Sequence, residues 1–186
     1  SGNDELPPIR LYDYQPSRGG YHAEEFLKDF TGYLTCDGFG GYNKLKNVIR
    51  CGCLAHMGRY WHEALPGKMK KSPDKTPAEI GFDYCNQLFE LERGYADLDA
   101  DTRKAKRLET EPAIWEAYWA WLETVNPAGG SRLAKAVTYA KNQKPYMENY
   151  LLDGRCSISN NIAENIARSY AVGRKNFLFH DTVRGA

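Results

Sequence analysis

The chain has 186 residues, of which 42% are hydrophobic and 26% are charged, and its formal net charge is +1. This length suits one domain, or one core with a sizeable insertion. No apolar run approaches the roughly 18 residues of a membrane span, and no signal peptide precedes the first predicted strand. Five cysteines form an odd set in a chain large enough to fold without disulfides. We therefore expect reduced thiols in a cytoplasmic protein that makes no membrane contact.

Taken in chain order, the first third of the sequence predicts alternating strands and helices. Strands are expected at residues 10–14, 33–36 and 47–53, and helices at 22–30 and 56–65. The links between these elements are short and rich in glycine, serine and proline. Such alternation favours the packed layers of an α/β fold.

From residue 76 to about residue 152 the hydrophobic residues follow helical spacing instead. Thr76 and the proline after it begin a capping box, and Pro112 marks a second helix start. Ser131 caps a third helix, which Pro145 is expected to kink or break. Three of the four tryptophans lie in this segment, at positions 115, 119 and 121. At this spacing they indicate a helical core rather than a platform for stacking bases.

Charge is segregated along the same elements. Residues 41–73 carry seven Lys/Arg against one acid, and residues 125–186 carry nine against four. Residues 74–124 reverse the sign, with six basic and twelve acidic residues. Basic surfaces attract nucleic acid because each neutralised phosphate releases counterions, although ordinary solvated faces would give the same pattern. Within the acidic segment, only the basic run at 103–107 is a candidate for contact with DNA.

Two carboxylates stand where phosphodiester chemistry would use them. Asp37 follows a short strand and precedes a glycine-rich turn, in the block Leu34–Asn43 (LTCDGFGGYN). Glu164 lies in the first turn of a predicted helix, in the block Ser157–Arg168 (SISNNIAENIAR). They are 164 − 37 = 127 residues apart, so only a fold with a long insertion could bring them together.

Each carboxylate also has a purely structural interpretation. Asp37 could form an Asx-turn before the glycines. Glu164 could complete a capping box with Asn161 or form a surface ion pair with Arg168. Cys53 and His56 could suggest zinc, but no second Cys/His pair follows at the spacing of a structural zinc site.

Together with the block Gly52–His56 (GCLAH), these motifs resemble the catalytic domain of insertion sequence 66 family transposases, over residues 12–186. The resemblance implies a DDE-type enzyme, in which two aspartates and a glutamate hold two Mg²⁺ or Mn²⁺ ions for DNA cleavage and strand transfer. It also implies a partial ribonuclease H-like sheet with a large helical insertion. The expected parts are residues 8–65 and 153–186 for the catalytic core and 66–152 for the insertion.

The resemblance assigns Asp37 and Glu164 as the catalytic, metal-binding residues and Cys53 and His56 as supporting residues. The expected DNA-binding residues are Arg59, Asn161, Arg168 and the pair Arg174 and Lys175, which we place in a loop after the helix. The expected partners are DNA, as transposon ends and target, and at least one further copy of the chain, because transposition joins two ends.

The sequence also departs from the family pattern. Ser159 and Asn165 stand where the family has aspartate and arginine, although neither position is a metal ligand. The family's first aspartate would lie upstream of this chain, and Asp13 is only a weak substitute for it. We therefore expect a catalytic fragment that is inactive alone and whose metal site is empty. The alternative is a catalytically silent, transposase-derived domain that binds DNA or acts as a scaffold.

Overall fold

The structure, a computed structural model, describes residues 9, 11, 13–67 and 74–176, with side chains up to residue 168 in the last helix. The chain divides into two compact units. The large unit comprises Tyr33–Gly38 and Ile49–Ser159. The small unit comprises Ser1–Gly32, Phe39–Val48 and Asn160–Ala186. The predicted boundaries of core and insertion remain a prediction.

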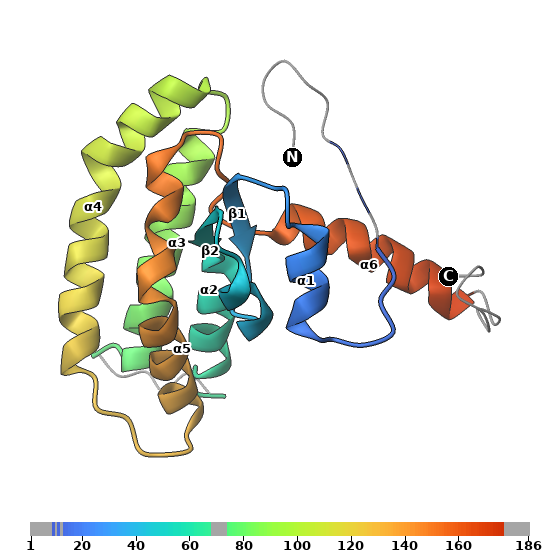
Figure 1. The fold of residues 1–186 in the computed structure, drawn as a ribbon. Helices are drawn as coiled ribbons and strands as arrows, with labels where there is room; N and C mark the ends of the chain where they lie inside the picture. The colour runs from blue at the N-terminus through green and yellow to red at the C-terminus, as the bar shows by residue number, and fades with distance from the viewer. Residues whose placement is uncertain (1–8, 10, 12, 68–73, 177–186) are drawn as a thin grey trace. The chain divides into compact units, whose positions relative to one another are not determined.

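The large unit combines two parallel strands with a group of helices (Figure 1). Its elements are β1 (Gly32–Cys36), β2 (Val48–Gly52), α2 (Leu54–Glu63), α3 (Pro77–Gly94), α4 (Ala100–Thr124), α5 (Arg132–Met147) and the 3-10 helix η2 (Asn149–Leu152). Helix α2 packs against both α3 and α5. The architecture is thus mixed α/β and mostly helical, as the alternating and then helical patterns predict. The two strands among the described residues are too few to define a ribonuclease H-like sheet, so that assignment remains a prediction.

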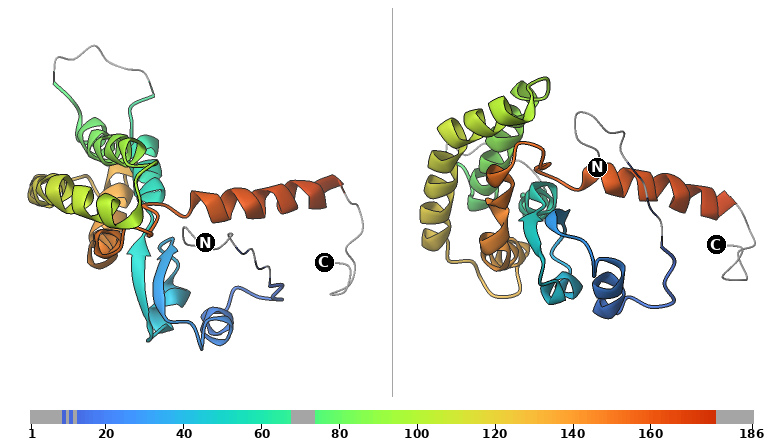
Figure 2. Two further views of the ribbon diagram at one scale, coloured as in Figure 1. Left: turned by 90° about the horizontal axis from the view of Figure 1, so that it is seen from above. Right: turned by 45° about the horizontal axis from the view of Figure 1, so that its top comes forward.

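The small unit contains α1 (Gly20–Phe26), the 3-10 helix η1 (Gly40–Lys44) and α6 (Asn161–Asn176). Helices α1 and η1 pack against each other, and both can be followed by their colour in Figure 2. They meet at Gly20 and Gly41. A methyl group added at Gly20 would lie 2.8 Å from the Cα atom of Gly41, so both positions need the smallest residue. The guanidinium of Arg18 lies 5.8 Å from the ring centre of Phe39, the residue before η1.

An aromatic core holds the large unit together. The side chains of Trp61, Trp115 and Tyr118 are fully buried where α2, α3 and α4 meet. Their polar atoms are paired, because the indole of Trp61 donates to the hydroxyl of Tyr118 at 3.1 Å. That hydroxyl in turn donates to the sulfur of Met57 at 3.3 Å. The predicted role of the tryptophans as core residues is confirmed.

Two of the predicted helix starts are confirmed by hydrogen bonds. The side chain of Thr76 accepts from the backbone N–H of Glu79 at 3.3 Å, and the carboxylate of Glu79 accepts from the backbone N–H of Thr76 at 2.6 Å. The hydroxyl of Ser131 accepts from the N–H of Ala134 at 3.0 Å. Each cap satisfies backbone donors that the first helical turn leaves unpaired.

The helix start predicted at Pro112 is wrong, and Pro145 does not break α5. Helix α4 begins after Asp99, whose carboxylate caps it by accepting from the N–H of Thr102 at 2.9 Å, and it runs through Pro112 without interruption. Helix α5 likewise continues past Pro145 to Met147. Both helices bury side chains on each side of the proline, and that burial outweighs the lost backbone hydrogen bond.

The strand predicted at residues 10–14 is also wrong for the residues described there. Leu11, Asp13 and Tyr14 lie outside any strand, and the apolar side chains of Leu11 and Tyr14 are exposed. Alternating residues form a stable strand only when a sheet face buries them. Arg10 and Tyr12 lie outside the described residues.

Candidate active site

The predicted catalytic aspartate lies where the strand β1 ends. Cys36, the last residue of β1, is buried, and the half-buried Asp37 follows it directly. The neighbouring parallel strand β2 ends at Gly52 and is followed by Cys53, which precedes α2. The carboxyl ends of parallel strands meet at one edge of a sheet, which is where α/β proteins bind ligands. The position predicted for Asp37 is therefore confirmed.

Helix α5 lies against the backbone of both strand ends. A methyl group added at Gly38 would lie 2.9 Å from Cε2 of Tyr139 and 3.0 Å from Nε2 of Gln143. At the other strand end, a methyl group added at Gly52 would lie 3.3 Å from Cα of Met147. The three α5 residues follow one another at four-residue steps, so one face of the helix covers this edge of the sheet. The helical segment thus contributes directly to the surroundings of Asp37.

The predicted supporting residues, Cys53 and His56, lie in the large unit, as Asp37 does. Cys53 is buried at the position that precedes the helix, and His56 is half-buried in the first turn. The N–H of Leu54 donates to the carbonyl of Ile158 at 3.0 Å, while the hydroxyl of Thr35 donates to the carbonyl of Ser157 at 3.2 Å. The chain before α6 therefore runs beside both strand ends. Arg59, further along α2, is exposed, as a residue that contacts DNA must be.

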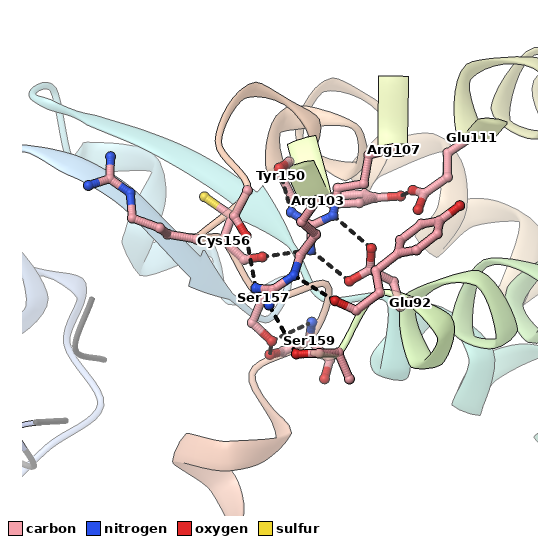
Figure 3. A network of polar contacts seen from close by, with 12 residues as sticks. Glu92, Arg103, Arg107, Glu111, Tyr150, Cys156, Ser157 and Ser159 are labelled. Atoms are coloured by element: carbon pink, nitrogen blue, oxygen red, sulfur yellow. Dashed lines mark hydrogen bonds and ion pairs between the residues drawn. The ribbon is translucent and has the colours of Figure 1, made fainter. Parts of the chain in front are cut away.

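The basic run at 103–107 does not present its arginines to DNA. Figure 3 shows Arg107 inside a polar network, where its guanidinium binds the carboxylate of Glu92 through two hydrogen bonds of 2.6 and 2.7 Å. The same group donates to the carbonyls of Tyr150, Asp153 and Cys156 at 2.9–3.2 Å.

The second arginine of that run, Arg103, has a similar role. Its guanidinium donates to the carbonyls of Tyr95, Ala96, Leu98 and Gly154 at 2.6–3.1 Å. These bonds hold together the end of α3 and the segment after η2. The candidate contact with DNA is therefore wrong for Arg103 and Arg107, because both arginines stabilise the fold instead.

The predicted catalytic glutamate belongs to the small unit. Glu164 lies in the first turn of α6, as predicted, and its N–H donates to the carbonyl of Asn160 at 3.0 Å. Helix α6 begins at Asn161, so this asparagine is the first helical residue rather than the cap of a capping box. Asn161 and Arg168 are both exposed. The distance between Glu164 and Asp37 remains a prediction, because the two residues belong to different units.

The cationic pair lies in a helix rather than in the predicted loop. Helix α6 extends to Asn176 and includes Arg174 and Lys175. Arginine and lysine suit the last turn of a helix, where they face the negative end of its dipole. Their side chains lie outside the described part of the chain, so a contact between them and DNA remains a prediction.

The donors required by a divalent metal are only partly assembled in the described residues. In the part of the chain that the structure describes, no group of three or more His, Cys, Asp or Glu side chains is arranged to hold a metal ion. Asp37 has the right chemistry, because a half-buried carboxylate at a strand end offers the hard oxygen ligands that Mg²⁺ prefers. A complete site would need at least one further carboxylate beside it, and Glu164 is the candidate.

Sequence patterns missed the polar groups that α5 and α4 bring to the large unit. Tyr139 and Gln143 contact Gly38 from about one hundred residues away, and no local motif marks them. Arg107 and Glu111 lie four residues apart on α4, which is also the spacing of an ordinary surface ion pair. Only burial distinguishes them, since both side chains are almost fully enclosed.

These observations define an α/β protein with a carboxylate at the carboxyl end of a parallel strand and a helical segment packed over that edge. Comparison with known sequences gives the family: the model described as "Transposase IS66 family" matches residues 1–186. The chain belongs to this family, and the resemblance seen in its motifs is confirmed.

Similar curated proteins come from Sinorhizobium fredii (strain NBRC 101917 / NGR234). "Uncharacterized protein y4qI" is 28% identical over 186 residues, covering 93% of this chain and 33% of the relative. "Uncharacterized protein y4jD" is 29% identical over 190 residues, covering 96% of this chain and 36% of the relative. The chain thus spans about a third of the length of these relatives. No solved structure matches the chain. Among the described residues, no helix is both long enough and apolar enough to cross a membrane.

Proposed function

We propose that this chain is part of the catalytic domain of a DNA transposase that cleaves and joins DNA strands in the cytoplasm. Membership of the transposase family supports the reaction class. The observation that carries the proposal is the position of Asp37, half-buried at the end of β1, with α5 packed against the glycine that follows it.

In this proposal Asp37 and Glu164 hold Mg²⁺ or Mn²⁺, and their carboxylates come within about 8 Å of each other to share a metal pair. When bound, the metal ions supply positive charge beside the attacking and leaving oxygens of the phosphodiester. The chain's own residues hold that site in place. The turn after Asp37 is fixed against α5, and the segment before α6 is held by Thr35, Leu54 and Arg107.

The proposal extends to the partners. Exposed polar residues, Arg59 on α2 and Asn161 and Arg168 on α6, would bind phosphates of the transposon ends and target. Such contacts fix the register of DNA without reading its sequence. Two transposon ends must be joined to one target, so the working complex contains at least two copies of the protein.

The test uses a full-length family member that carries this chain, with DNA of its own element ends and Mg²⁺. Asp37→Asn and Glu164→Gln should each abolish strand cleavage and leave DNA binding nearly unchanged, because both substitutions keep the size of the side chain and remove its charge. Glu116→Gln, an exposed position on α4, is the matched control and should cleave normally. Cleavage by either of the first two variants at the wild-type rate would refute the catalytic assignment. Wild-type protein that binds the ends without cutting them would support the scaffolding alternative.

A further inference from the structure

The hydroxyl of Tyr139 is buried, and among the described residues it has no hydrogen-bond partner. A buried hydroxyl without a partner destabilises the folded state, so such groups are uncommon unless something else uses them. A phenylalanine at this position would fill the same volume without that cost. The presence of the hydroxyl therefore needs an explanation outside the stability of the fold.

The ring of Tyr139 is held firmly in place. It stacks on the ring of Tyr60 from α2, with the ring centres 4.4 Å apart and the planes inclined by 25°. Its Cε2 atom, which adjoins the carbon that bears the hydroxyl, lies 2.9 Å from the position of a methyl group added at Gly38. This edge of the ring therefore lies against the residue that follows Asp37.

The protonation state of Tyr139 is consistent with its position beside the turn that carries Asp37. Burial raises the pKa of Tyr139, and the nearby groups of Cys53, Asp37 and Tyr60 raise it further. The phenol therefore keeps its proton at physiological pH and can only approach a carboxylate as a hydrogen-bond donor. Gln143, one turn further along α5, is buried against the same glycine. Two polar side chains of the helical segment thus converge on the turn that carries Asp37.

We propose that Tyr139 is a positioning residue for Asp37: its hydroxyl donates a hydrogen bond to the Asp37 carboxylate when that carboxylate binds a divalent metal ion. An ionised carboxylate has two oxygens and room for about four hydrogen bonds, so one oxygen can hold the metal while the other accepts from Tyr139. Carboxylates that bind metals are commonly oriented by such outer partners, and losing one costs about 10- to 100-fold in metal affinity or activity. This inference rests on the proposed function of Asp37.

The experiment measures Mn²⁺ binding to a full-length family member carrying this chain, by electron paramagnetic resonance of the free ion, together with thermal unfolding without metal. Tyr139→Phe should weaken Mn²⁺ binding about 10- to 100-fold. In the absence of metal it should unfold at the same temperature as the wild type or higher, because the unpaired hydroxyl is gone. Tyr146→Phe removes a hydroxyl two turns along the same helix, from a ring that packs 4.0 Å from the Arg50 guanidinium, and should change neither property.

The Asp37→Asn variant separates failure of this inference from failure of the proposed function. If Asp37→Asn binds Mn²⁺ like the wild type, the proposed function is wrong. If Asp37→Asn loses Mn²⁺ while Tyr139→Phe binds it as tightly as the wild type, only the positioning role is overturned. A clear loss of stability in Tyr139→Phe would also overturn it, because the hydroxyl would then serve the fold. In the Asp37→Asn background, Tyr139→Phe should have no further effect on Mn²⁺.

Discussion

Glu111 is a fully buried acid inside the large unit, where a charged carboxylate is costly. One of its oxygens accepts a hydrogen bond from the hydroxyl of Tyr150, which itself accepts from the indole of Trp115 at 3.1 Å. The other oxygen has no donor among the described residues, and the negative charge of Glu92 disfavours a second charge at Glu111. Burial raises the pKa of Glu111 to about 7 and favours protonation there.

This raised pKa predicts a stability that falls with rising pH. Between the ordinary pKa of about 4.5 and the native value of about 7, the folded chain keeps a proton that the unfolded chain has lost. The free energy of unfolding should therefore decrease across this range by at most about 3 kcal/mol and level off above pH 7. Urea unfolding at several pH values checks this against Glu111→Gln, which cannot ionise and should lack this decrease.

A control variant separates the pH effect of Glu111 from that of the other acidic residues. Glu116→Gln, an exposed site on the same helix, should follow the pH dependence of the wild type. If Glu111→Gln and the wild type lost stability in parallel from pH 5 to pH 8, Glu111 would be ionised in the folded protein throughout.

At the scale of elements, α4 carries a proline in the middle of its 25 residues. Pro112 cannot donate to the carbonyl of Leu108, and a proline inside a helix costs about 3 kcal/mol relative to alanine. Pro112 is exposed, so replacing it disturbs no core contact. Pro112→Ala should therefore raise the free energy of unfolding by roughly 1–2 kcal/mol, after allowance for the freer unfolded chain.

Chemical denaturation measures this change, and Pro77 supplies the control. Pro77 is the first residue of α3, where no backbone hydrogen bond is lost and the fixed backbone angle suits the helix. Pro77→Ala should leave stability unchanged or lower it slightly. A destabilising Pro112→Ala would mean that the ring of this proline makes a contact that matters more than the missing hydrogen bond.

The elements that could be predicted from the sequence are those that depend on neighbouring residues. The caps at Thr76 and Ser131 depend on residues three positions away, and β1 depends on a short apolar run before Asp37. The helix start predicted at Pro112 was wrong because the burial of α4 side chains against distant parts of the chain outweighs the local cost of the proline. Arg107 and Tyr139 could not be recognised at all, since their partners lie dozens of residues away and no periodic pattern marks them. The candidate site was predicted through its motifs, but not through the helix that encloses it.

At the scale of the whole molecule, the proposed function requires contacts with DNA. The pair Arg174 and Lys175 on α6 is expected to bind phosphates, which adds affinity for any duplex. Changing both to alanine in a full-length family member should weaken binding to element ends and unrelated DNA alike. The slope of log affinity against log salt should become shallower by about 2, because roughly 0.9 counterion is released per phosphate contact.

Filter binding or fluorescence anisotropy across a salt series checks this expectation. Changing Lys104 and Lys106 to alanine removes the same charge from the acidic segment, where Lys106 is already paired with Glu109 at 2.8 Å, and should leave the slope unchanged. Loss of binding confined to the element's own ends would instead indicate that Arg174 and Lys175 read sequence.

The reactivity of the cysteines can be used to measure transient opening of the large unit. Positions 36, 51, 53, 85 and 156 are all buried free thiols, and every one belongs to the large unit. The neighbouring thiols of Cys51 and Cys156 interact, which raises the pKa of Cys51 and lowers that of Cys156. A thiol-specific reagent can therefore label the native chain only when the large unit opens transiently. Local unfolding of α1 or α6 does not expose a cysteine and gives no labelling. The labelling rate, followed with increasing urea, measures the free energy of that opening without an engineered cysteine.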